Sequence, residues 1–305
     1  MSRIEIAETG VTGSEVEEHE DEFERHRPLL FSIAYRMLGS VVDAEDIVQE
    51  AYFRWHRTRP NQLESPRSYL CTIVTRLCID HLRSARVRRE EYVGPWLPEP
   101  LVGPVDEDPL ETALLAESLS TAFLLLLERL TEVERAVFLL REVFSFDYPE
   151  VARIVGRSNA ATRQIAKRAR DRLADGATRF SASQEMAEHL VHRFIDACTS
   201  GDLDGLLELL TEDAVTFNDG GGKVLAALRP IYGRERVARF YVGIFRKFWA
   251  QPRVRVLTVN GQPGVLVQTI DGIRRVLTFA FKNGRIEGIF LVVNPDKLQR
   301  MPPGA

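Results

Sequence analysis

The chain has 305 residues, of which 45% are hydrophobic, and a formal net charge of −4. That size and composition predict a globular protein of two or three domains, and no apolar run approaches the roughly 18 residues of a membrane span. The N-terminal stretch lacks the apolar core of a signal peptide, and the three cysteines form no CxxC pair. We therefore expect a cytoplasmic protein without a disulfide framework, a metal site or a cofactor.

Charge is concentrated in three segments of the chain. Residues 65–90 carry six arginines against two acids, and residues 153–173 carry seven bases against one acid. Between them, residues 93–117 carry six acids and no base. Two basic segments, each within a helical pattern, predict two anion-binding surfaces, for which nucleic acid is the best partner. The alternative is that both are solvated helix faces.

The first part of the chain is predicted to be helical after an acidic start. Residues 1–22 are rich in acids and predict a disordered tail. Residues 23–92 have helical periodicity. Within them, Asp43 is the expected cap of the amphipathic helix DAEDIVQEAYFRWHR, while Ser65 and Pro66 open a second helix that ends in arginines.

A stiff connector then leads to a second helical segment. Residues 93–112 form a proline-rich linker that contains WLPEP, and residues 113–178 return to helical periodicity. Capping signals stand at Thr131 and Asp147. A short helix, a brief turn and a basic helix capped by Ser158 give the layout of a helix-turn-helix.

The basic helix of this motif has one apolar face and one polar face. The apolar face is predicted to be buried and contains Thr162, Ile165, Ala166, Ala169 and Leu173. The outward residues predicted to reach base edges are Asn159, Arg163, Gln164 and Lys167, with Arg168 and Arg170 nearer the phosphates. A helical hairpin with a basic face also occurs as a plain packing unit, which is the alternative interpretation.

Residues 184–300 have a different pattern, typical of an α+β domain. Two helices precede six β-like runs: AVTFND, KVLAAL, VRVLTVN, GVLVQTI, RRVLTFAF and RIEGIFLVV. Asp271-Gly272 and Asn283-Gly284 are strong hairpin signals, so we expect helices leading into an antiparallel sheet.

Taken jointly and in this order, the helical motifs resemble those of a known family. DAEDIVQEAYFRWHR and SPRSYLCTIVTRLCIDHLRSARVRRE resemble region 2 of bacterial extracytoplasmic-function sigma factors, and LTEVERAVFLLREVFSFDYPEVARIVGRSNAATRQIAKRARDRL resembles their region 4. WLPEP, DGGGK and NPDKL resemble motifs of the subgroup with a C-terminal SnoaL-like domain. The resemblance implies two all-α sigma domains followed by a SnoaL-like cone of curved antiparallel sheet and helices.

The resemblance also implies roles for particular residues. Contact with the clamp helices of core RNA polymerase is expected of Asp43, Glu45, Asp46, Gln49 and Glu50. Recognition of the minus-ten promoter element is expected of Arg76, Asp80, Arg83, Arg86, Arg88 and Arg89. Recognition of the minus-thirty-five element is expected of Ser158, Asn159, Arg163, Gln164, Lys167, Arg168 and Arg170, on a domain that also meets the polymerase flap. Ala161, Thr162 and Arg163 depart from the usual pattern, so the promoter sequence does not transfer from relatives.

The stiff linker is interpreted as a ligand within the chain. Prolines reduce the entropy lost on docking, and Trp96 is the expected anchor in an apolar pocket. We expect a regulatory contact between Trp96, Leu97, Pro98, Glu99 and Pro100 of the linker, Asp219, Gly220, Gly221, Gly222 and Lys223 of one loop, and Asn294, Pro295, Asp296, Lys297 and Leu298 of the C-terminal segment. The alternative is that Trp96 packs only on its own helical neighbours.

Three functions follow, in order of preference. The first is an alternative sigma factor, not an enzyme, that works as a monomer on core polymerase and promoter DNA and needs no separate anti-sigma factor. The second adds a C-terminal domain that binds or converts a small molecule, with Asp219, His189, His192 and Tyr241 as candidate residues. HxxH without acidic or thiol partners is a weak metal signal. The third is a DNA-binding regulator that acts without polymerase.

Overall fold

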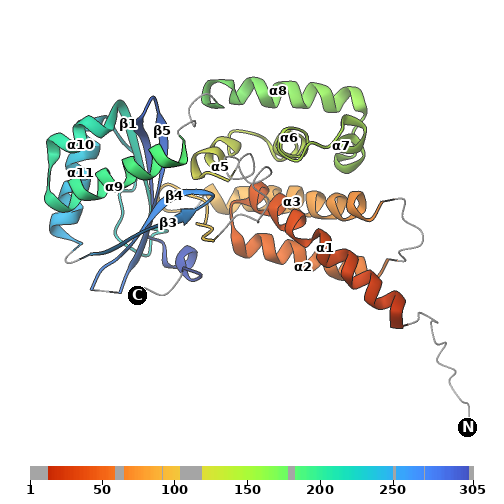
Figure 1. Ribbon diagram of the computed structural model, residues 1–305. Coiled ribbons are helices and arrows are strands. Elements are labelled where there is room, and N and C mark those ends of the chain that lie inside the picture. The colour runs from red at the N-terminus through yellow and green to blue at the C-terminus, as the bar shows by residue number, and fades with distance from the viewer. Residues whose placement is uncertain are drawn as a thin grey trace, which may run out of the picture.

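The computed structural model describes residues 13–58, 65–90, 92–103, 119–177, 183–249, 252–270 and 272–301, with the backbone alone for 13–18, 85–90 and 175–177. A helical half containing the elements from α1 to α8 lies beside an α+β half that begins at α9 (Figure 1). The linker of residues 92–103 passes between the two halves.

Three helices make up the first helical unit: α1 (Gly13–Leu38), α2 (Val41–His56) and α3 (Pro66–Glu90). The cap of α2 is Ser40, whose hydroxyl accepts a hydrogen bond from the Asp43 amide at 3.2 Å, so Asp43 lies in the first turn and does not cap it as predicted. The Ser65 hydroxyl accepts from the Ser68 amide at 3.2 Å, as its sequence position indicated.

The prediction of a disordered tail over residues 1–22 is wrong for residues 13–22, because α1 already begins at Gly13. Residues 1–12 lie outside the described part of the chain. The His19 ring is buried and stacks on Trp55 with ring centroids 4.1 Å apart. The Trp55 indole donates to the His19 carbonyl at 2.8 Å. This contact holds the acidic segment on α2, which its charge alone did not predict.

The second helical unit contains α5 (Thr121–Leu127), α6 (Glu132–Phe138), the π-helical turn η2 (Leu139–Val143), α7 (Tyr148–Val155) and α8 (Asn159–Ala177). Thr131 and Glu134 form the predicted capping box. Gly156, in the left-handed conformation, ends α7 and turns the chain into α8. The predicted buried face of α8 is confirmed for Thr162, Ile165, Ala166, Ala169 and Leu173.

The third unit packs helices against one mixed sheet. Its elements are α9 (Gln184–Ser200), α10 (Leu203–Leu209), β1 (Leu210–Asp219), β2 (Ile231–Tyr232), α11 (Arg234–Lys247), β3 (Arg253–Val259), β4 (Gln262–Gln268), β5 (Arg274–Lys282), β6 (Arg285–Val292) and the 3₁₀ turn η3 (Pro295–Leu298). The strand order is β2-β1-β6-β5-β4-β3.

The expected antiparallel sheet needs one correction, because β1 runs parallel to β6. Tight turns join β3 to β4 and β5 to β6, and a two-residue hairpin forces antiparallel pairing. No such turn joins β1 to β6, which are separated by most of the domain. Asn283 and Gly284 both have positive φ, of 51° and 71°, as the predicted hairpin requires.

The strand expected at 223–228 is also absent from the described residues, where β2 follows instead at Ile231–Tyr232. The Lys223 amide donates to the Gly220 carbonyl at 3.0 Å, which closes a turn. Leu225 and Leu228 are 85% and 64% exposed, so these apolar side chains do not join a sheet face. An apolar run alone does not make a strand when turn residues precede it.

Two apolar layers lie on opposite faces of the sheet. Because side chains alternate along a strand, Val265 and Val267 face the helices α9 to α11, whereas Leu266 faces the linker. The linker-side cluster also includes Leu97 of the linker and Ala122 of α5. The two helical units share one continuous core. The linker therefore lies in a junction that all three units form.

Candidate functional site

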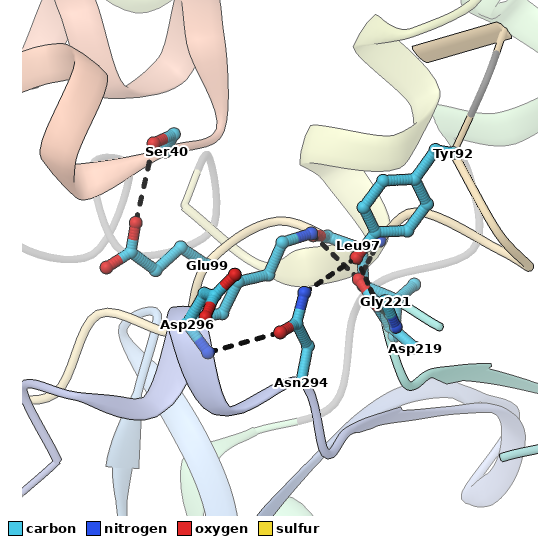
Figure 2. A network of polar contacts seen from close by, with 9 residues as sticks. Ser40, Tyr92, Leu97, Glu99, Asp219, Gly221, Asn294 and Asp296 are labelled. Atoms are coloured by element: carbon cyan, nitrogen blue, oxygen red, sulfur yellow. Dashed lines mark hydrogen bonds and ion pairs between the residues drawn. The ribbon is translucent and has the colours of Figure 1, made fainter. Parts of the chain in front are cut away.

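Asp219, at the end of β1, holds the linker on the third unit. Its fully buried carboxylate accepts hydrogen bonds from the Tyr92 hydroxyl at 2.5 Å, the Leu97 amide at 2.9 Å and the Gly221 amide at 3.1 Å. The Lys297 ammonium lies 2.7 Å from the same carboxylate. Figure 2 shows Tyr92, Leu97 and Gly221 meeting at the Asp219 side chain. A buried carboxylate needs hydrogen bonds and an opposite charge to offset the loss of water, and Asp219 has both.

Lys297 contacts the backbone and both aromatic residues of the linker. Its ammonium donates to the Leu97 carbonyl at 2.5 Å and lies 4.4 Å from the ring centroid of Trp96 and 5.1 Å from that of Tyr92. Cation–π contacts of this kind are worth about 0.5–2 kcal/mol, depending on desolvation. The C-terminal segment therefore binds the linker through Lys297, next to the end of β1.

The apolar anchor of the linker is Leu97, whereas Trp96 was expected. Leu97 is fully buried in the cluster on the linker side of the sheet, and Trp96 is only partly buried. Trp96 lies between two units, because a Cβ atom placed on Gly39 would come within 2.7 Å of its ring, and Lys297 covers the other side. Trp96 thus contacts both the third domain, as the docking prediction expected, and the helical half, as the alternative expected.

The other end of the linker is bound to the helical half through Glu99. The Glu99 carboxylate accepts hydrogen bonds from the Val41 amide at 2.8 Å, the Val42 amide at 3.4 Å and the Ser40 hydroxyl at 3.4 Å. Glu99 is only 5% exposed, and this burial raises its pKa while the two amide hydrogen bonds oppose the rise. A carboxylate at a helix N-terminus also favourably meets the helix dipole. Glu99 thus caps α2 from outside the helix.

Asn260, in the β3–β4 turn, connects all three units. Its side-chain oxygen accepts from the Leu101 amide at 2.8 Å, and its nitrogen donates to the Tyr35 hydroxyl at 2.9 Å and to the Leu119 carbonyl at 3.1 Å. The Tyr35 hydroxyl in turn donates to the Glu99 carbonyl at 2.7 Å. Every group in this network is paired, as buried polar groups require.

The glycine-rich loop and the C-terminal segment meet closely. A Cβ atom on Gly221, where φ is 58°, would lie 2.3 Å from the Asn294 side chain, and one on Gly222 would lie 3.2 Å from Val93. The Asn294 amide nitrogen donates to the Tyr92 hydroxyl at 2.9 Å, and its oxygen accepts from the Asp296 amide at 3.1 Å. Only glycine permits this approach at positive φ.

The remaining predicted docking residues lie around this contact. Lys223 pairs with Asp296 at 2.5 Å on the surface. Gly220 opens the loop and Pro295 begins η3; the buried residues among these remaining ones are Pro98, Pro100, Gly220 and Leu298. The structure therefore brings the three predicted motifs together, with Tyr92, Leu101, Asn260 and Tyr35 as additional contacts. Asn260-Gly261 resembles a hairpin turn in the sequence, and nothing local to it indicates its interdomain hydrogen bonds.

The helix-turn-helix presents a polar face to solvent. Among the residues predicted to contact DNA, the exposed ones on α8 and its cap are Ser158, Arg163, Gln164, Lys167, Arg168 and Arg170, and Asn159 is partly buried. Arg163 lies over the Tyr148 ring at 5.5 Å, and the Ser158 hydroxyl accepts from the Ala161 amide at 3.2 Å. The face of α8 that was predicted to reach base edges is therefore open to solvent.

The arginines of α3 are placed differently. Arg76 donates to the Ile154 carbonyl at 3.2 Å, at the end of α7, and Arg83 pairs with Glu132 of α6 at 3.1 Å and with Asp80 at 3.4 Å. These contacts turn the predicted minus-ten residues of α3 toward the second helical unit. The side chains of Arg86, Arg88 and Arg89 lie outside the described part of the chain.

The acidic face of α2 is exposed at Glu45, Asp46, Gln49 and Glu50, with Asp43 partly buried. Glu45 makes a bidentate ion pair with Arg300 of the C-terminal segment. The hydrogen bond from Arg300 lowers the pKa of Glu45 below its usual value. No local pattern indicated this contact, which links the third unit directly to the predicted polymerase-binding helix.

Nothing in the described residues favours a metal centre: they contain no group of three or more His, Cys, Asp or Glu side chains that could hold an ion. His189 and His192 are exposed on α9. Among the same residues, no helix is long and apolar enough to cross a membrane.

Comparison with known proteins matches each unit to a family model. Residues 23–88 match Sigma-70 region 2, residues 120–173 match Sigma-70 region 4, and residues 191–289 match the SnoaL-like domain. The three units therefore define the class: a sigma factor of two helical regions with a SnoaL-like domain attached.

Similarity to whole proteins narrows the class. The chain is 37% identical to the ECF RNA polymerase sigma factor SigJ of Mycobacterium tuberculosis, over 92% of this chain and 93% of that protein. It is 34% identical to the probable ECF RNA polymerase sigma factor SigI of the same species, over 90% and 92%. The crystal structure of SigJ superposes with a TM-score of 0.74 at 35% identity, covering 92% of this chain and 98% of that one. The chain belongs to the ECF RNA polymerase sigma factors.

Proposed function

We propose that this protein is an alternative sigma factor that binds core RNA polymerase through α2 and directs initiation at promoters read by α3 and α8. The observation that carries the proposal is the exposed polar face of α8, with Arg163, Gln164 and Lys167 outward on a helix-turn-helix. Arginine and glutamine each match a base edge in two places, and lysine adds a salt-dependent phosphate contact. The acidic face of α2 suits a basic partner on the polymerase.

The structure supports a closed state that opens on promoter DNA. The minus-ten and minus-thirty-five elements are about 25 base pairs apart, or roughly 85 Å at about 3.4 Å per base pair. In the closed arrangement Arg76 of α3 bonds the end of α7, immediately before α8. One rigid closed molecule cannot hold both elements at that separation. Polymerase binding must therefore supply the free energy that separates the two helical units.

The third domain is the proposed regulator of that opening, acting in cis. Asp219 holds the linker at Leu97, and two residues further on Glu99 caps α2. A segment bound at both ends restrains the helical units, and the linker prolines strengthen the restraint because a stiff chain gains little conformational entropy on release. Arg300 adds direct competition with the polymerase for Glu45. A built-in restraint of this kind would let a monomer work without a separate anti-sigma factor.

A second function, small-molecule binding in the cone, is favoured by one observation. Within the described residues both polar atoms of the Asn218 amide are buried without a hydrogen-bond partner. The same strand face carries Thr216, whose hydroxyl lies 2.8 Å from that of Tyr241. Leaving a buried amide without hydrogen bonds costs about 1–3 kcal/mol, and a polar ligand that bonded to it would recover this free energy. Native mass spectrometry of the protein and of Asn218→Leu would show whether a copurified molecule depends on this amide.

Mobility-shift assays with core polymerase test the leading proposal. Promoter duplexes selected from a random library by the complex should be shifted by the protein and core together, and by neither alone. A specific shift by the protein alone would favour a regulator that acts without polymerase. No specific shift by the complex would contradict the sigma function.

A further inference from the structure

Helix α11 of the third domain carries a basic stripe made of Arg236, Arg239, Arg246 and Lys247, all of them exposed. At about 100° per residue these four positions fall within one quarter to one third of the helix circumference. The opposite side of α11 is the one that packs in the domain, through Val237, Ala238, Tyr241 and Phe245. The stripe is therefore the solvent face of the helix.

Within the third domain, α11 is basic whereas the neighbouring helices are acidic. Residues 234–247 contain five bases and one acid, a net charge of +4, whereas residues 184–209 of the neighbouring helices contain six acids and one base, a net charge of −5. Arg239 lies 3.6 Å from Glu235. In the described part of the chain, none of Arg236, Arg246 and Lys247 makes an ion pair. Three of the four charges are thus available to an external anion.

The spacing of the charges fits a DNA groove. The pair Arg236/Arg239 and the pair Arg246/Lys247 have midpoints nine residues apart, or about 14 Å along a helix that rises about 1.5 Å per residue. The major groove is about 12 Å wide between its phosphate backbones. Gly243 lies between the pairs, and a Cβ atom added there would meet nothing within 4 Å. The centre of the stripe therefore leaves room for close approach.

We propose that α11 binds the phosphate backbones of duplex DNA across a groove, next to the element that α8 reads. The proposal rests on the sigma function above, which places α8 on DNA. From Ala177 at the end of α8 to Gln184 at the start of α9 the chain can extend at most about 25 Å, at about 3.6 Å per residue. The third domain must therefore stay close to any duplex that α8 binds.

The test measures holoenzyme affinity for two promoter duplexes, one ending at the minus-thirty-five element and one extending about 30 base pairs upstream. The triple variant Arg236→Gln, Arg246→Gln, Lys247→Gln should lose about ten- to one-hundredfold in affinity for the long duplex at low salt. Its salt slope should fall by about 2–3, since each phosphate contact contributes about 0.9. Affinity for the short duplex should not change.

A matched variant separates the stripe from net charge. Arg229→Gln, Arg253→Gln, Arg255→Gln removes the same charge from exposed positions elsewhere in the domain and should bind both duplexes normally. An equal loss from this variant, or no loss from the α11 variant, would overturn the proposal. If the α11 variant bound both DNA duplexes normally but bound a duplex RNA more weakly than the unmodified protein, the proposal would also be overturned in favour of RNA. If the unmodified holoenzyme formed no promoter complex, the sigma function itself would fail instead.

Discussion

The Asn260 side chain donates a hydrogen bond to the Tyr35 hydroxyl at 2.9 Å, which joins the third domain to the first sigma helix. Asn260 also bonds Leu101 of the linker and Leu119 before α5. The hydrogen bonds of this one buried side chain therefore form together only when all three units are assembled. The closed state can be weakened here without touching either predicted DNA-binding helix.

Asn260→Ala should open the junction. The change removes the partners of the Leu101 amide and the Leu119 carbonyl and one of the two hydrogen bonds of the Tyr35 hydroxyl, and it places alanine at a φ of 52°; together these should cost about 2–4 kcal/mol. Hydrogen exchange of the Leu97 amide, which donates to Asp219 and does not contact Asn260, measures this opening free energy. Asn283→Ala is the control, because it has a φ of 51° in an exposed turn and should cost only about 1 kcal/mol. Equal costs would mean that the interdomain bonds contribute nothing.

Two ion pairs in the same region should differ sharply in their contribution. Asp219→Ala leaves the Lys297 ammonium, 13% exposed, without its carboxylate and should cost about 3–5 kcal/mol of linker docking. Lys223→Ala breaks a pair in which both side chains are 54% exposed and should cost less than about 1 kcal/mol.

Protection of the Leu97 amide from hydrogen exchange compares the two variants directly. Because Asp219 accepts from that amide, its protection should collapse in Asp219→Ala and stay nearly normal in Lys223→Ala. Similar protection in both variants would show that burial of the Lys297 pair does not matter for docking.

Docking of Glu99 should depend on pH. Burial raises its pKa above the ordinary value of 4.5, so the docked form binds more protons than the released form at pH values just above 4.5. The docked form should therefore lose stability as the pH rises from 4.5 to the raised pKa, and stay constant above it. Glu99→Gln keeps an acceptor for the Val41 amide but does not titrate.

The Glu99→Gln variant should thus show no contribution from this group to the pH profile. Val41 amide exchange, corrected for its intrinsic pH dependence, measures the difference. A wild-type profile that matches the variant, or one that gains stability across the window, would contradict a raised pKa for Glu99 in the docked linker.

Arg300→Ala should strengthen binding to core polymerase modestly. It frees Glu45, but the two side chains are 46% and 47% exposed, so the pair is worth no more than about 1 kcal/mol. Affinity for core should rise about two- to fivefold in a fluorescence titration. Arg285→Ala removes an equal charge from the exposed first residue of β6 and should leave the affinity unchanged. Weaker binding by Arg300→Ala would mean that Arg300 itself contacts the polymerase.

Local signals in the sequence predicted most of the helical half. The buried face of α8 follows from residues such as Thr162 and Ala169 at helical spacing, and the capping box at Thr131 depends on neighbours only three residues apart. The linker motifs and their meeting place were predicted from resemblance. Asp219 was included there, but its number of donors was not predictable.

Long-range pairing accounts for what the sequence did not reveal. The parallel pairing of β1 with β6 and the contacts of Asn260 join residues far apart in the chain, and no local pattern encodes them. Leu97 replaced Trp96 as the anchor because the pocket is closed by the sheet and η3, and a branched aliphatic side chain fits where the larger indole remains partly outside. Arg76 was predicted to face DNA, whereas in this structure its guanidinium donates to the Ile154 carbonyl at the end of α7.

Regulation in cis can be tested by run-off transcription with bacterial core polymerase, comparing the full chain with residues 1–182 on promoters selected by the complex. We predict that both forms start specific transcripts that core alone does not, at clearly different levels, because the third domain restrains the sigma helices. Equal levels would contradict regulation in cis by the third domain. The absence of specific transcripts with either form would contradict the sigma function itself.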